Sequence, residues 1–123
     1  MNLKSSALHM AVAFLGMGAW ALFANRGHPL PEALTAGLVQ GAMSATITLF
    51  LKRMIEALSI RLSGLSALIL PPALALAGSV GVLSLIHSLA GTPEIIATIA
   101  VPVTVTAIYS SAYCFALWRA SHA

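Results

Sequence analysis

Four side chains in the sequence have the chemistry of divalent-metal ligands. They are the imidazoles and carboxylates of His28, Glu32, His87 and Glu94. A mixed nitrogen and oxygen set suits zinc and other transition metals when three or four ligands converge. The sequence lacks the short motifs HxxxH and HxxE that bring two ligands to one helix face. We therefore expect these residues to be solvated near a membrane surface, and we expect no metal and no other cofactor.

The sequence also lacks the groups that covalent catalysis requires. It contains no aspartate, no GxSxG elbow and a single cysteine, Cys114. A serine or cysteine nucleophile needs a neighbouring base, and no histidine is expected at the depth of Cys114. No phosphate-binding loop or dinucleotide fingerprint occurs. We expect the protein not to be an enzyme, and we assign no catalytic residues.

Polar positions recur inside one long apolar run, residues 32–54. At 100° per residue, small and weakly polar side chains gather on one helix face and bulky side chains on the other. The polar face contains Gly37, Gln40, Gly41, Ser44 and Thr48. Two interpretations stay open for it. It is either a path along which a substrate crosses the membrane or a helix-packing seam, of which a GxxxG pair is typical.

Two later segments have small-residue faces of the same kind. One face contains Ala73, Ala77, Gly81, Ser84 and Ser88, and the other contains Ala97, Ala100, Thr104, Ala107 and Ser111. Small residues let membrane helices approach closely, and hydroxyls can bond across the contact. Gly81, Thr104 and Ser111 are therefore further candidates for a packing seam or a substrate path.

The composition assigns these faces to membrane helices. Of the 123 residues, 59% are hydrophobic and 7% are charged, whereas roughly a quarter of residues are charged in soluble domains. A helix needs about 20 apolar residues to cross a bilayer. Four runs meet this length: residues 7–25, 32–51, 66–89 and 94–117. We predict an all-α, four-helix transmembrane bundle that forms a single domain over residues 1–123.

Basic residues predict how the bundle is oriented. Lys4, Lys52, Arg53, Arg61 and Arg119 fall on one side of the predicted membrane, and only Arg26 falls on the other. Short cytoplasmic loops are enriched in lysine and arginine. We therefore expect a plasma (inner) membrane protein with both termini in the cytoplasm. The basic residues flank apolar segments and form no stripe, so we expect no nucleic-acid partner.

The second span is predicted to continue as an amphipathic helix on the cytoplasmic side. Leu51, Ile55, Leu58 and Leu62 recur at helical spacing, and Gly64 is available as the stop. We expect this extension to be an interfacial cuff at the level of the lipid headgroups. A docking site for a cytoplasmic partner is the alternative.

Pro71 and Pro72 interrupt the start of the third span. Proline removes a helix donor and frees the carbonyl four residues earlier. The pair therefore predicts a kink or a division of the helix, with free carbonyls near Ala67 and Leu68.

In size and expected topology, the chain is similar to small four-helix carriers such as the small multidrug resistance transporters and the GtrA-like flippases. The multidrug carriers hold an acidic residue in their first helix, and "LHMAVAFLGMGAWALF" at 8–23 contains none. The predicted spans also have no carboxylate at mid-membrane, which argues against a proton-coupled carrier.

Two functions of different class follow. The first is an oligomeric component that translocates an uncharged or lipid-linked substrate, and the repeated polar groups of residues 32–54 favour it. The second is a non-catalytic accessory subunit that holds a larger membrane complex together. The expected partners are membrane lipid and either further copies of the chain or a larger membrane protein.

Overall fold

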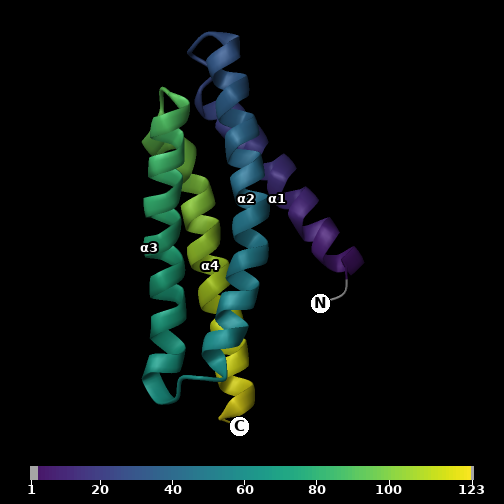
Figure 1. Cartoon of the computed structure of the whole chain (residues 1–123), viewed down its shortest axis with the longest axis vertical. Coiled ribbons are helices and arrows are strands. Elements are labelled where there is room, and N and C mark those ends of the chain that lie inside the picture. The colour runs from purple at the N-terminus through teal and green to yellow at the C-terminus, as the bar shows by residue number, and fades with distance from the viewer. Residues whose placement is uncertain (1–2, 123) are drawn as a thin grey trace.

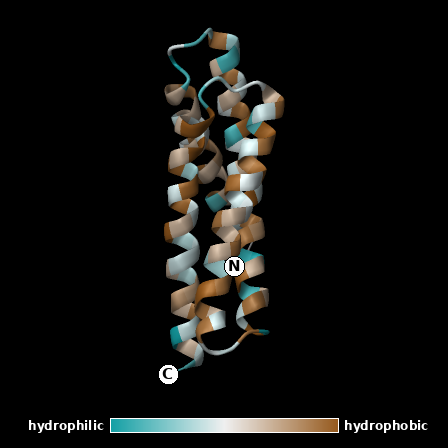
Figure 2. Ribbon diagram, turned by 90° about the vertical axis from the view of Figure 1, so that its left-hand side faces the viewer, coloured by the Kyte–Doolittle hydropathy of each residue, from teal (hydrophilic) through white to brown (hydrophobic). Residues whose placement is uncertain are grey.

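A computed structural model describes residues 3–122 as four helices joined by short loops (Figure 1). The helices are α1 (Leu3–Ala24), α2 (Leu30–Ser59), α3 (Gly64–Ala90) and α4 (Ile95–Ser121). All four are long and apolar enough to cross a membrane. The described chain is therefore all-helical with four candidate membrane spans, as its composition predicts. Figure 2 shows the ribbon mostly brown to white along its middle, with hydrophilic colour mainly towards the ends.

Helix α2 is the centre of the arrangement. It packs against α1, α3 and α4, and α3 and α4 also pack against each other. Helix α1 contacts α2 and α4 but does not approach α3 in the described part of the chain. In Figure 1, α1 crosses α2 near the α1–α2 loop, and its N-terminal half leans away from the other helices. Among the described side chains of α1, only that of Ala21 is buried.

The α1–α2 crossing depends on glycine. A Cβ added to Gly37 would lie 3.1 Å from the carbonyl oxygen of Gly18, and one added to Gly41 would lie 2.9 Å from that of Phe14. These distances are shorter than side chains normally allow, so the two backbones are in direct contact. The GxxxG pair of α2 therefore packs against α1.

The α3–α4 contact uses other faces than the sequence pattern predicts. The buried positions recur every four residues: Ala67, Pro71, Ala75, Ser79, Leu83 and His87 in α3, and Thr98, Pro102, Thr106, Ser110 and Cys114 in α4. Such rows form the ridges by which helices interdigitate. Gly81, Thr104 and Ser111 are exposed instead. Each helix has small residues on both faces, so the spacing alone did not identify the face that meets a neighbour.

Helix α3 runs unbroken through Pro71 and Pro72, so the predicted division of the helix is wrong. The predicted free carbonyls are nevertheless present, and α4 supplies a donor for them. The thiol of Cys114 lies 3.0 Å from the carbonyl oxygen of Ala67 and 3.6 Å from that of Leu68. A partner on the neighbouring helix replaces the lost backbone donor, and this allows the helix to continue.

The extension of α2 is helical to Ser59, as predicted, and it stays within the bundle. Ile55 is fully buried. Glu56 accepts hydrogen bonds of 2.9 Å from Lys52 and from the hydroxyl of Tyr113 on α4. Gly64 does not end this helix but begins α3, where its φ is +61°.

Replacing Gly41 with alanine is expected to loosen the α1–α2 crossing, because the added Cβ would meet the Phe14 carbonyl at 2.9 Å. Overpacking of this kind costs about 1–3 kcal/mol. We therefore expect a lower midpoint of thermal unfolding in detergent micelles. The control is Gly81→Ala, where a Cβ meets no atom within 4 Å. Equal unfolding midpoints for the two variants would contradict the close crossing.

Candidate functional site

The polar face of α2 is joined to the end of α3 by a chain of hydrogen bonds. His87 Nε2 lies 2.8 Å from Gln40 Oε1, and His87 Nδ1 lies 2.7 Å from the hydroxyl oxygen of Thr92. Gln40 Nε2 donates to the hydroxyl of Ser44 over 2.7 Å. An amide oxygen can only accept, so His87 Nε2 carries the proton. In the neutral ring, Nδ1 then accepts from Thr92.

These four residues, which we call the buried polar chain, are shielded from the surroundings. Gln40 and His87 have no exposed surface, and Ser44 and Thr92 are each 7% exposed. In the part of the chain that the structure describes, every fully buried side-chain nitrogen and oxygen has a hydrogen-bond partner. Gln40 therefore bonds to α3 through His87 and within its own helix to Ser44.

The other candidate seam residues differ in how far they are buried. Gly37 and Gly41 are buried beside α1. Thr48 is half-buried, and its hydroxyl donates to the carbonyl of Ser44 in its own helix over 2.8 Å. The exposed residues Gly81, Thr104 and Ser111, by contrast, face away from the bundle and take no part in the buried polar chain.

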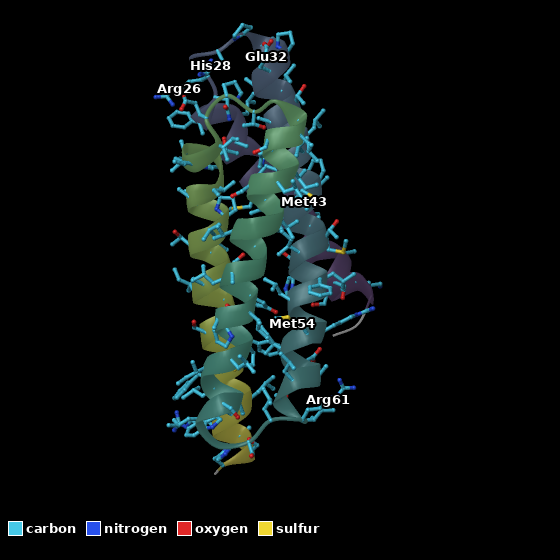
Figure 3. The ribbon with its side chains drawn as sticks, turned by 60° about the vertical axis from the view of Figure 1, so that its left-hand side comes forward. Arg26, His28, Glu32, Met43, Met54 and Arg61 are labelled. Carbon is cyan, nitrogen blue, oxygen red and sulfur yellow. The ribbon has the colours of Figure 1, made fainter. Side chains whose placement is uncertain are left out.

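The structure does not bring the four metal-ligand candidates together at one site. His28 Nε2 lies 3.0 Å from Glu94 Oε1, at the end of the bundle where the α1–α2 loop lies. Figure 3 labels His28 and Glu32 at that end. His87 is buried among helices, which corrects the expectation that it is solvated. No three His, Cys, Asp or Glu side chains of residues 3–122 are grouped so that they could hold a metal ion.

A second buried polar cluster was missed by the sequence reasoning. Asn25 Nδ2 donates to the carbonyl of Ala21 over 2.8 Å and to the hydroxyl of Thr98 over 2.7 Å. Asn25 Oδ1 accepts the backbone N–H of Glu94 over 3.0 Å. Both Asn25 and Thr98 are fully buried. This cluster ties the end of α1 to the start of α4, and its only sequence signal was an amide at the last position of the first predicted span.

Comparisons with known proteins give no relative. No family model, no curated protein and no solved structure matches the chain. The function therefore has to be argued from the chain's own residues and their arrangement.

Replacing Gln40 with leucine is expected to destabilise the bundle. The change removes the partner of His87 Nε2 and that of the Ser44 hydroxyl, and a buried polar group left unpaired costs about 1–3 kcal/mol. We expect the free energy of unfolding, measured by denaturant titration in mixed micelles, to fall by this amount. The control is Thr104→Val, which removes an exposed hydroxyl bonded only to its own helix at Ala100. A Gln40→Leu variant as stable as the parent would contradict the role of the buried polar chain.

Proposed function

We propose that this protein is a non-catalytic accessory subunit that packs against a larger protein in the membrane. The observation that carries the proposal is that both polar atoms of the Gln40 amide have hydrogen-bond partners within the protein. The amide is fully buried and bonded to both His87 and Ser44. Polar groups that serve a passing substrate must exchange partners with it, whereas a satisfied buried network makes a helix contact rigid.

Helix α1 supports this proposal because the other helices leave part of its surface uncovered. It does not approach α3 within the described residues, and its N-terminal half leans away from the bundle (Figure 1). Leu8, Val12 and Leu15 are each more than half exposed. Apolar exposure of this kind suits contact with lipid, and the open side of α1 also leaves room for a helix of another protein.

We also propose that the protein lies in the plasma membrane with both termini and the α2–α3 loop in the cytoplasm. The α1–α2 and α3–α4 loops share the opposite end of the bundle (Figure 1). The proposed cytoplasmic side has Lys4, Lys52, Arg53, Arg61 and Arg119, and the other side has Arg26. This asymmetry supports the orientation, because lysine and arginine are enriched in cytoplasmic loops.

Translocation is the second candidate function, and one observation favours it. Gly81, Thr104 and Ser111 face outward from the single chain. Several copies that packed through these faces would enclose weakly polar groups between them. In that case the path for an uncharged or lipid-linked substrate would lie between chains, outside the interior of each bundle.

Native mass spectrometry of the protein, extracted gently from its own membrane, tests the two candidates. An accessory subunit is expected to leave the membrane bound to a larger, different protein. A homo-oligomer that retains a defined substrate would overturn this proposal in favour of translocation. A protein found only as a lone monomer would contradict both.

Two matched variants identify, by the same mass-spectrometry experiment, which helix face contacts the proposed larger partner. A Cβ at Gly16 or at Gly81 would meet no atom within 4 Å, so leucine at either position is expected to leave the isolated bundle intact. Gly16→Leu changes the open face of α1 and is expected to release the larger partner. Gly81→Leu changes the outward face of α3 and is expected to leave that complex in place. Dissociation by Gly81→Leu alone would contradict a partner on α1.

A further inference from the structure

An apolar groove of about 250 Å³ runs along the outside of the bundle between α2 and α3. Its walls include Met43, Ile47, Phe50 and Met54 from α2 and Leu74 and Val82 from α3. Figure 3 labels Met43 and Met54, which lie along α2 beside α3. Methionine is flexible and polarizable, and it adapts to chains of irregular shape. The groove therefore suits a flexible hydrocarbon chain.

Two residues of α3 shape the groove: Gly78 has no side chain to fill it, and Ser79 places a hydroxyl in its wall. Gly78 lies in its wall, and a Cβ there would meet no atom within 4 Å. Ser79 also lines the groove and is only 4% exposed. Its hydroxyl makes no hydrogen bond to the described residues, so its oxygen is not one of the fully buried polar atoms and is open to the groove. A hydroxyl without a partner in an apolar groove favours a ligand that brings an acceptor.

The groove continues towards the guanidinium of Arg53, which has no ion-pair partner among the described residues. Thr46, Phe50 and Met54 line both the groove and a second hollow on α2, and Arg53 lines that hollow. Arg53 is exposed, and no residue of the described chain pairs with it. The neighbouring Lys52 is already held by Glu56 at 2.9 Å. Arg53 lies two residues after the end of the predicted apolar span, so we place its guanidinium at the level of the headgroups.

We propose that this groove is a binding site for one anionic phospholipid of the surrounding bilayer. An acyl chain lies along the methionine-lined wall, and the lipid phosphate binds Arg53. The guanidinium matches phosphate both in charge and in its paired donors. The Ser79 hydroxyl donates to an ester carbonyl of the same lipid. A transmembrane helix of another protein would fill an apolar groove, but it would not account for a free cation at one end.

The test uses the full-length protein, freed of lipid in detergent and titrated with phosphatidylglycerol or phosphatidylcholine carrying the same acyl chains. Native mass spectrometry measures the bound fraction. We expect tighter binding of phosphatidylglycerol. Arg53→Gln should weaken it about fivefold, which is the contribution of one basic residue near an anionic headgroup. The same change should weaken phosphatidylcholine binding less, because the choline cation of that lipid offsets the charge of its phosphate. The control Arg61→Gln removes an exposed arginine that lines neither hollow, and it should change neither affinity.

A second pair of variants tests the position of the acyl chain. Gly78→Leu fills the groove and should weaken binding of both lipids, whereas Gly81→Leu on the same helix lies outside the groove and should weaken neither. Thermal unfolding checks that both variants remain folded. The proposal is overturned if the two lipids bind equally, or if Gly78→Leu or Arg53→Gln leaves phosphatidylglycerol binding unchanged. It is also overturned if Gly78→Leu instead separates pairs of protein chains, since a helix is then the occupant. None of these results depends on whether a larger protein partner is found.

Discussion

A polar side chain inside a bilayer has no water to bind, so it must find its hydrogen-bond partners within the protein. Gln40 satisfies this constraint through His87 and Ser44, and His87 through Gln40 and Thr92. The pairing joins an early turn of α2 to the last turn of α3. Because these helices are antiparallel, one such contact fixes which of their turns lie opposite each other. The α2–α3 interface and the groove beside it both depend on this register.

The remaining helices are held around this pair by contacts of a different kind. Glycine brings the α1 backbone against α2 at Gly37 and Gly41, and Asn25 ties the end of α1 to α4. At the other end, the Cys114 thiol donates to a carbonyl that Pro71 leaves free. The structure shows hollows between α1 and α2 and along the α2–α3 groove.

The sequence predicted the four helices well, because apolar length and helical periodicity are local properties. It also predicted that Gln40, Ser44 and the GxxxG pair share one face of α2. It could not predict that His87 would turn inward to meet Gln40, since that contact joins positions 47 residues apart. Which faces of α3 and α4 meet each other could not be predicted for a related reason. Both helices have small residues all round, and only the tertiary arrangement decides which row is buried.

Magic-angle-spinning NMR of the protein in lipid bilayers measures the central contact directly. Gln40 is the only glutamine in the chain, so a ¹³C label on its side-chain carbonyl reports on one site. With ¹⁵N-labelled histidine rings, the 2.8 Å bond between Gln40 Oε1 and His87 Nε2 predicts a measurable dipolar coupling of that carbonyl carbon to one ring nitrogen. The coupling should disappear in His87→Leu. Absence of the coupling in the parent protein would contradict a buried polar chain that closes α2 against α3.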